Sequence, residues 1–435
     1  MDDGFIWGAA SASYQIEGGV GERGLSVWDM YCREPGRILD GSSGDVACDA
    51  YHRWKDDVAI MKEIGLKAYR FSISWPRVMP TGQGSVSSAG LDYYERLCET
   101  LAEAKIQPWV TLFHWDFPYE LYKLGGWMNS ESPRWFEDYA DAVTRRLGKY
   151  VRHWITINEP QCFIGLGHAG GEHAPGLKYP LWDTLLMSHN VLLAHGRAVS
   201  KIRSNIPDAR VGFAPTGDVP IPRSIAPEDI ERARREYFSL KDDVFWDVAF
   251  FSDPVFLGKY PEDVLSKYGA IMPKITSEDM DVISAPLDFC GQNIYRGEGA
   301  DARNHGRPIT AAKWGITPES LYWGPRFLYE RYKKPIVITE NGLSCADVVS
   351  LDGRVHDSNR IDYLNRYLLE YKRAAKDGVP LIGYFQWCLT DNFEWSKGYT
   401  ERFGIVYCDF VTGVRIRKDS SYWYADVIRA NGHNL

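Results

Sequence analysis

Eight short apolar runs alternate with longer amphipathic stretches along this chain, and this alternation restricts the possible folds more than any other feature. The runs are rich in β-branched and aromatic residues, which indicates buried strands. They span residues 5–10, 68–74, 108–114, 153–158, 211–215, 289–294, 336–339 and 381–387. Apolar residues at helical spacing predict helices between them, most clearly at 51–64, 90–104 and 360–375. The pattern predicts an α/β fold in which eight parallel strands close into a (β/α)8 TIM barrel.

The length of 435 residues fits one such barrel, because barrels with insertions can exceed about 400 residues within a single domain. No low-complexity linker, coiled-coil heptad run or sharp change in composition divides the sequence. We therefore expect residues 1–435 to form a single domain with its active site at the C-terminal ends of the strands. Loops or small insertions over that mouth are expected at 36–50, 160–180, 296–317 and 392–413.

The net charge and the spacing of the cysteines limit the binding partners and the cellular compartment to be expected. The net charge is −8 and no basic block is present, which argues against a nucleic acid partner. The N-terminus has neither a basic nor an apolar segment of the signal-peptide type, and no apolar run is long enough to cross a membrane. The eight cysteines are scattered without a C-x-x-C motif, as expected for free thiols in a reducing compartment. We expect a cytoplasmic protein without membrane partners, and the residues leave its oligomeric state open.

Two motifs raise the possibility of a cofactor or a metal ion. Residues 19–24 fit the pattern G-x-G-x-x-G, but the short aromatic segment 25–29 that follows does not predict a convincing helix. A loop over the barrel mouth is therefore favoured over a dinucleotide site. His168 and His173 lie five positions apart in a glycine-rich stretch that predicts a loop, whereas helical zinc sites use H-E-x-x-H. We therefore expect neither a cofactor nor a metal ion.

Two of the predicted strands end on a glutamate. The run W-I-T-I-N-E-P places Glu159 after Asn158, and the run I-V-I-T-E-N-G places Glu340 before Asn341. A strand-end salt bridge would explain either glutamate alone. Both together, each beside an asparagine at the same edge of the barrel, favour a pair of catalytic carboxylates. Such a pair suits glycosidic-bond cleavage, in which one carboxyl donates a proton and the other remains ionised.

Other predicted strand ends carry side chains that suit the same chemistry. Arg70 is expected to hold the pKa of the ionised glutamate low, and Asn158 can bond a sugar 2-hydroxyl. Aromatic residues are abundant, with 16 Trp, 26 Tyr and 18 Phe. Most of the tryptophans belong in the core, but the flat apolar face of the indole also suits stacking against a pyranose ring. Trp387 lies at the end of the last predicted strand, where this fold places functional residues.

The motifs taken together resemble those of family 1 glycoside hydrolases, the retaining β-glycosidases. The resemblance covers nearly the whole chain and rests on eight motifs in order: F-I-W-G-A-A-S-A-S-Y-Q-I-E-G-G, Y-R-F-S-I-S-W-P-R, T-L-F-H-W-D-F-P, T-I-N-E-P, H-A-P-G, Q-N-I-Y, I-T-E-N-G and W-C-L-T-D-N-F-E-W. It implies that Glu159 is the acid/base and that Glu340 is the nucleophile. It implies support for these two from Arg70, Asn158, Asn293 and Tyr295.

The same resemblance implies two groups of sugar-binding residues. The non-reducing sugar, or glycone, would be held by Gln15, His114, Trp387, Glu394, Trp395 and Phe403. The leaving group, or aglycone, would contact Trp115, His173 and Trp314. Relatives that bind 6-phosphorylated sugars carry a Ser and a Lys-Tyr clamp near the position of Glu394. This chain has E-W-S-K-G-Y there, so an unphosphorylated sugar is favoured despite Lys397.

The expected function is that of a retaining exo-β-glucosidase. Its expected substrates are the terminal β-D-glucosyl residues of cello-oligosaccharides and of aryl or alkyl β-glucosides, and also β-galactosides and β-fucosides. A transglycosidase would use the same residues, and a non-catalytic sugar-binding barrel would be expected to lack one of the two glutamates. The sequence does not separate hydrolysis from transglycosylation.

Overall fold

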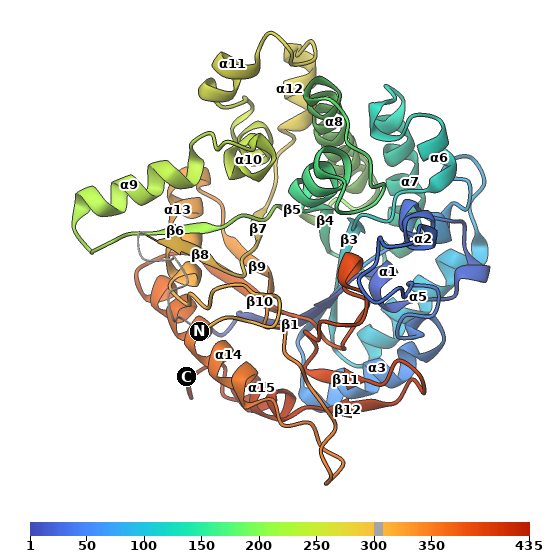
Figure 1. Cartoon of the computed structure of the whole chain (residues 1–435), viewed down its shortest axis with the longest axis vertical. Helices are drawn as coiled ribbons and strands as arrows, with labels where there is room; N and C mark the ends of the chain where they lie inside the picture. The colour runs from blue at the N-terminus through green and yellow to red at the C-terminus, as the bar shows by residue number, and fades with distance from the viewer. Residues whose placement is uncertain (300–307) are drawn as a thin grey trace.

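The computed structural model describes residues 1–299 and 308–435 of the chain. Within these residues, eight parallel strands close into a barrel surrounded by helices (Figure 1). The strands are β1 (Ile6–Ser11), β2 (Ala68–Ser72), β3 (Gln107–Phe113), β4 (His153–Asn158), β5 (Arg210–Ala214), β7 (Phe289–Asn293), β9 (Ile336–Asn341) and β10 (Leu381–Trp387). Neighbours in the barrel follow the order of the chain, and β10 closes it by pairing with β1. The predicted (β/α)8 fold and its eight strands are confirmed.

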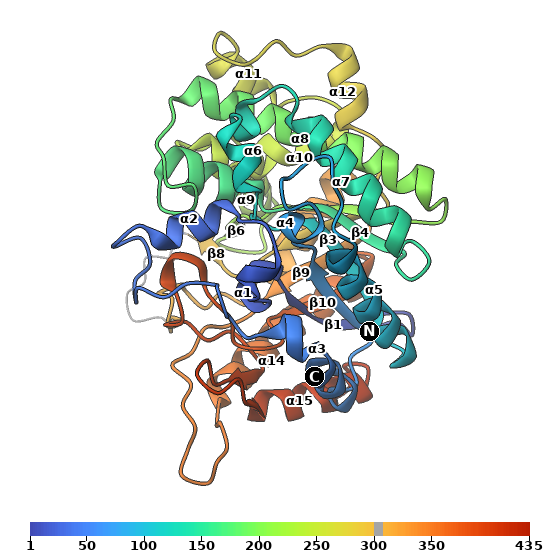
Figure 2. The same ribbon diagram turned by 90° about the vertical axis from the view of Figure 1, so that its right-hand side faces the viewer.

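Helices of varied length surround the barrel in both views (Figures 1 and 2). They are α1 (Ser13–Ile16), α2 (Val27–Arg33), α3 (Ala50–Ile64), α4 (Trp75–Val78), α5 (Ser88–Glu103), α6 (Tyr119–Lys123), α7 (Ser132–Leu147), α8 (Leu181–Asn205), α9 (Pro227–Phe238), α10 (Val248–Leu257), α11 (Glu262–Tyr268), α12 (Ser277–Ile283), α13 (Ser320–Tyr332), α14 (Ser358–Lys376) and α15 (Asp419–Arg429). The three helices that the sequence predicts most clearly are confirmed as α3, α5 and α14.

The local sequence explains how these helices begin, end and pack. In α5, Leu91, Tyr94 and Leu101 fall on one stripe and are buried against the barrel. Ser87 caps the helix by accepting a hydrogen bond from the backbone of Gly90 at 3.1 Å. Helix α3 ends where Gly65 adopts a φ of 82°, a left-handed conformation that glycine reaches without strain.

Short elements lie in the connections around the mouth. They are η1 (Val20–Glu22), η2 (Gly126–Met128), η3 (Gln161–Gly170), η4 (Val244–Trp246), η5 (Trp395–Lys397), β6 (Val219–Ile221), β8 (Gly297–Gly299), β11 (Val406–Cys408) and β12 (Arg415–Arg417). Strands β6 and β8 pair in parallel beside α9, whereas β11 and β12 form an antiparallel pair. Residues 300–307, which belong to the predicted loop 296–317, lie outside the described residues.

Two expectations for these connections are wrong. The segment after the G-x-G-x-x-G pattern forms α2, because Ser26 and Asp29 cap each other's backbone in a capping box. Residues 161–170, predicted as loop, form the π-helical segment η3 instead. The segment is glycine-rich but mostly buried, and tertiary packing stabilises it against the low helix propensity of glycine.

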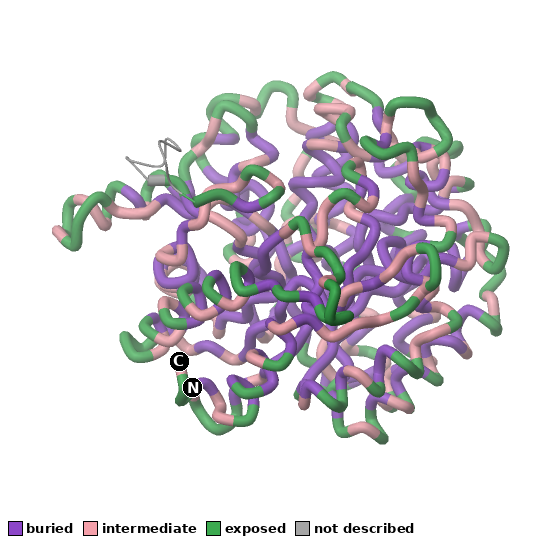
Figure 3. Tube along the Cα trace, turned by 60° about the horizontal axis from the view of Figure 1, so that its bottom comes forward, coloured by how far each residue is buried: buried purple, intermediate pink, exposed green. Residues whose placement is uncertain are grey.

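Aromatic side chains fill the half of the barrel at the N-terminal ends of its strands. Trp109 of β3 lies 5.3 Å from Phe289 of β7 and 5.1 Å from Phe385 of β10, measured between ring centroids. These rings are buried, and buried segments concentrate at the centre of the molecule (Figure 3). This end of the barrel is therefore a packed core, which leaves the C-terminal ends of the strands for a ligand.

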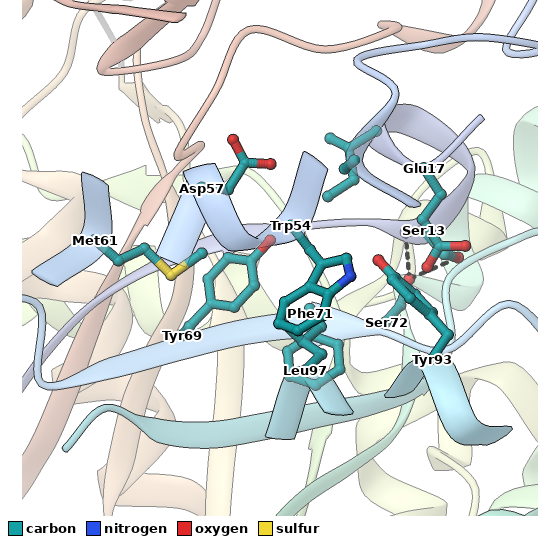
Figure 4. A pocket seen from close by; sticks show the side chains of 12 residues that line it. Ser13, Glu17, Trp54, Asp57, Met61, Tyr69, Phe71, Ser72, Tyr93 and Leu97 are labelled. Atoms are coloured by element: carbon teal, nitrogen blue, oxygen red, sulfur yellow. Dashed lines mark hydrogen bonds between the residues drawn. The ribbon is translucent and has the colours of Figure 1, made fainter. Parts of the chain in front are cut away.

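A small cavity lies behind the barrel wall, where α3, β2 and α5 meet (Figure 4). Its walls include Trp54 of α3 together with Tyr69 and Phe71 of β2. Beside it, the backbone N–H of Ser13 donates to Ser72 Oγ at 2.7 Å and ties α1 to β2. The volume of about 20 Å³ suffices for one water molecule and excludes a sugar.

Candidate active site

A cavity of about 410 Å³ opens at the C-terminal ends of the barrel strands. Most of the predicted site residues line it: His114, Trp115, Glu159, His173, Tyr295, Trp314, Glu340, Trp387, Glu394, Trp395 and Phe403. The remaining predicted residues, Gln15, Arg70, Asn158 and Asn293, are buried behind this lining and bond to it. The fold thus brings the whole predicted set together, in a cavity of the size that small-molecule ligands occupy.

Glu340 ends β9 and is held at both carboxylate oxygens. Arg70 on β2 donates from Nη1 to Oε1 at 2.6 Å, and the Tyr295 hydroxyl donates to Oε2 at 2.8 Å. Burial raises the pKa of Glu340 above its ordinary value, and these two donors oppose the rise. The expectation that Arg70 holds the pKa of Glu340 low is therefore wrong in its net direction, because the loss of solvent outweighs the ion pair.

A hydrogen-bonded relay joins the two glutamates. Arg70 Nη2 donates to Asn158 Oδ1 at 2.5 Å, and Asn293 Nδ2 donates to the same oxygen at 3.1 Å. Asn293 Nδ2 also donates to Glu159 Oε1 at 2.7 Å. The guanidinium therefore contacts Glu340 directly and reaches Glu159 through two asparagine amides.

Among residues 1–299 and 308–435, no cationic side chain forms an ion pair with Glu159. Its Oε1 accepts from Asn293, and its Oε2 faces the Cys162 thiol at 3.2 Å. Burial, followed by the negative charge of Glu340, raises the pKa of Glu159 to about 8. An amide and a thiol stabilise the ionised carboxylate less than a guanidinium does. Of the two acids, Glu340 is accordingly the one that loses its proton first.

The backbone around the cavity adopts conformations that L-residues usually avoid. Glu159, Trp115 and Trp395 have φ values of 43°, 80° and 50°. Such strain is found where the surrounding structure fixes a side chain for function. Here the Glu159 N–H donates to the Ala214 carbonyl at 2.8 Å, and Trp115 Nε1 donates to the Asn158 carbonyl at 3.0 Å. These contacts hold the residues that follow β3 and β4 in place.

Gln15 and Glu394 form a polar corner of the cavity. Gln15 Nε2 donates to Glu394 Oε2 at 3.3 Å, which links α1, after β1, to the segment after β10. Gln15 Oε1 is buried and has no partner within the described part of the chain. Burial, then the charges of Glu340, Glu401 and Glu159, raise the pKa of Glu394 to about 8. This corner presents an amide and a carboxyl to the hydroxyls of a ligand.

His114 packs beside this corner. Its ring stacks on Trp387 and Trp395 at centroid distances of 5.8 and 5.9 Å. Asn158 Nδ2 faces His114 Nε2 at 3.2 Å, and an amide nitrogen can only donate, so Nε2 accepts. Burial and the charge of Arg70 hold the pKa of His114 well below its ordinary value. The ring is therefore neutral, with its proton on Nδ1.

Several residues in and around the cavity were not predicted from the sequence. Trp28 on α2 packs 4.6 Å from Trp395 and supports it from behind. Arg296, which pairs with Asp218 at 2.7 Å, and Trp246 also line the cavity. Cys162 could have been noticed, because it follows Glu159 by three positions, but only its helical conformation brings the thiol to the carboxylate.

In residues 1–299 and 308–435, no group of three His, Cys, Asp or Glu side chains is arranged to hold a metal ion. No helix in the described ranges has the length and apolarity needed to span a bilayer.

Comparison with known proteins places this site in a family. The family model described as glycosyl hydrolase family 1 matches residues 1–305 and 296–433. A 1,4-beta-D-glucan glucohydrolase of Thermotoga neapolitana is 44% identical, over 99% of this chain and 98% of its own. Beta-glucosidase A of Thermotoga maritima is also 44% identical, over 99% and 98%.

Solved structures agree with this relationship. A structure of beta-glucosidase from Thermotoga maritima in complex with azafagomine superposes with a TM-score of 0.92, at 43% identity and 99% coverage of both chains. The family model and these full-length relatives confirm the resemblance on which the sequence interpretation rested. The chain belongs to glycosyl hydrolase family 1 and is a glycosidase.

Proposed function

We propose that this protein is a retaining exo-β-glucosidase. Its substrates are the terminal β-D-glucosyl residues of cello-oligosaccharides and of aryl or alkyl β-glucosides, with β-galactosides and β-fucosides as further substrates. The observation that carries the proposal is the unequal environment of two carboxyls in one cavity. Glu340 contacts a guanidinium and a phenol, whereas Glu159 contacts an amide and a thiol.

In the first step, Glu340 attacks the anomeric carbon and Glu159 donates its proton to the leaving oxygen. The raised pKa of Glu159 keeps that carboxyl protonated at neutral pH. Arg70 and Tyr295 hold the two oxygens of Glu340 in fixed positions, which reduces the ordering needed to reach the transition state. A covalent glycosyl-enzyme forms and the aglycone departs.

In the second step, Glu159 is ionised and accepts a proton from water as that water attacks the glycosyl-enzyme. Glu340 leaves as a carboxylate and again pairs with Arg70. Because two displacements occur at the anomeric carbon, the product keeps the β configuration. Neither step requires a cofactor or a metal ion.

The contacts between residues of the cavity wall support exo action. Gln15 bonds Glu394, and His114 bonds Asn158. The His114 ring also stacks on Trp395. We assign the glycone to this side, where Trp387 and Trp395 offer aromatic faces to the ring. The partly exposed side, with Trp314, receives the aglycone. The names of the similar Thermotoga enzymes agree with glucose as the terminal sugar.

The eight cysteines are free thiols, which supports a cytoplasmic location. In that compartment the enzyme would complete cellulose degradation by converting short cello-oligosaccharides to glucose.

Variants of the two glutamates test the mechanism. Glu340→Gln should lower kcat on 4-nitrophenyl β-glucoside by on the order of 10⁴-fold or more, because no covalent intermediate forms. Glu159→Ala should retain attack on a substrate with an activated leaving group and, with added azide, yield β-glucosyl azide. NMR of early products should show β-glucose. Near-normal turnover by Glu340→Gln or first-formed α-glucose would refute the proposal. Product analysis with an added alcohol measures how far transglycosylation competes with hydrolysis.

A further inference from the structure

Cys162 lies inside the catalytic cavity and contacts the carboxyl of Glu159. It is the second residue of η3, which begins directly after the Glu159-Pro160 pair. The side chain is 7% exposed and lines the cavity, and its Sγ lies 3.2 Å from Glu159 Oε2. Neither step of the proposed mechanism uses this thiol.

The relay from Arg70 determines which oxygen of Glu159 carries the proton. A guanidinium can only donate, so Asn158 Oδ1 must be an acceptor. The group of Asn293 that faces this oxygen must then be its NH₂, in agreement with the Thr339 hydroxyl donating to Asn293 Oδ1 at 2.6 Å. The same NH₂ faces Glu159 Oε1, which therefore accepts. The acidic proton is left to Oε2, the oxygen beside Cys162.

A thiol suits that position because it can both donate and accept weakly. When Oε2 carries the proton in the free enzyme, sulfur can accept from it, and the proton passes to the scissile oxygen once the substrate is bound. When Oε2 is ionised, S–H can donate to it. A lysine or arginine there would favour the ionised form strongly, and an alanine would leave Oε2 without this partner.

We propose that Cys162 is a positioning residue for the acid/base, holding Glu159 Oε2 toward the scissile oxygen in both protonation states and partly stabilising the ionised form. The inference rests on the proposed function, since it assumes that Glu159 transfers a proton in each step. The thiol contacts Glu159 Oε2 at 3.2 Å and acts on the substrate only through this carboxyl. Its influence on the pKa of Glu159 is downward, opposite to the larger effect of burial.

The first test is the pH dependence of kcat/KM for cellobiose in Cys162→Ala and Cys162→Ser. Loss of the thiol donor in Cys162→Ala should raise the pKa of Glu159 and move the alkaline limb upward by roughly half a pH unit. Cys162→Ser retains a donor and acceptor, so the alkaline limb of its kcat/KM profile should lie at the same pH as in the wild type or at a lower pH. Cys98→Ala, which removes a buried thiol from α5, is the matched control and should not move the limb. Coincident limbs for Cys162→Ala and wild type would overturn the proposal.

The second test compares leaving groups. In Cys162→Ala, kcat/KM for cellobiose should fall several-fold, because this leaving group needs the proton of Glu159. For 2,4-dinitrophenyl β-glucoside, kcat/KM should be unchanged, because dinitrophenolate departs without a proton from Glu159. An equal fall on both substrates would indicate a packing defect and overturn the positioning role. If Glu159→Gln leaves the wild-type alkaline limb intact, the assignment of Glu159 itself fails, and this outcome is separate from the behaviour of the Cys162 variants.

Discussion

Arg70 and Glu340 form a buried ion pair of 2.6 Å between β2 and β9, two strands that are not neighbours in the barrel. The guanidinium that contacts Glu340 also bonds Asn158 on β4. One cation carried by β2 therefore holds groups from two other strands, β4 and β9, at the mouth. Its charge acts on the proposed nucleophile, and its geometry orients the amides that lead to the proposed acid/base.

The charge of Arg70 is expected to set the acidic limb of the pH–rate profile. Activity should be lost as pH falls through the pKa of Glu340, because the proposed nucleophile must be ionised. Arg70→Met removes the charge that opposes the raised pKa, so the limb of kcat/KM should move upward by about one pH unit. Arg70→Lys keeps the charge but loses the second contact, so it should lower kcat with a smaller shift. An unmoved limb in folded Arg70→Met would contradict this account.

Replacing Glu159 should stabilise the protein at alkaline pH. The pKa of Glu159 is about 8 in the folded state and near 4.3 when unfolded. Its stabilising effect is fully present below the unfolded pKa and is lost as pH rises through the folded pKa. Glu159→Gln removes this dependence, so thermal scans should show its advantage over wild type growing between pH 5 and 8.5, by on the order of 1–3 kcal/mol. A constant difference across this range would count against the raised pKa.

Glu394 should make glucose affinity depend on pH. An ionised carboxylate accepts hydroxyl hydrogen bonds more strongly, and the pKa of Glu394 is about 8. Calorimetric affinity for glucose should therefore increase with pH through this region. Glu394→Gln should bind roughly tenfold or more weakly, with a flatter dependence. Glu401→Gln keeps Glu394 but removes a charge that raises its pKa, so its affinity should rise at a lower pH than in wild type.

Trp314 should affect only substrates that extend beyond the first sugar. The indole packs on Tyr295 and Phe403 at centroid distances of 5.3 and 6.0 Å, on the side that we assign to the aglycone. Trp314→Ala should lower kcat/KM for cellobiose by roughly 5- to 30-fold, the equivalent of about 1–2 kcal/mol of apolar contact. For methyl β-glucoside the change should be small. Equal losses on the two substrates would place Trp314 with the glycone instead.

The sequence was sufficient to predict the barrel, because each strand is a local apolar run with clear ends. It also predicted which strand ends carry polar residues, since a parallel barrel brings those ends to one mouth. Glu159 and Glu340 could be paired on that basis alone. Which of the two glutamates ionises first depends on their contacts with Arg70 and Asn293 across the barrel. Spacing along the chain does not encode these contacts.

Segments whose conformation depends on packing were predicted less well. The glycines of 161–170 indicate a loop, yet burial stabilises η3 and turns Cys162 toward Glu159. Trp28 belongs to a stretch too short to predict a helix, and its place behind Trp395 follows only from the assembled mouth. The pKa of Glu340 was misjudged because desolvation is a property of the folded chain.

The contact between Gln15 and Glu394 has a consequence for how activity arises during synthesis. The two residues flank the seam where the first and last barrel strands meet, and Glu394 is made 379 residues after Gln15. A nascent chain that stops before residue 394 lacks part of the proposed sugar pocket, even if most of its barrel has formed. Glucose bound between Gln15 and Glu394 would bridge the first and last strands and hold the barrel closed.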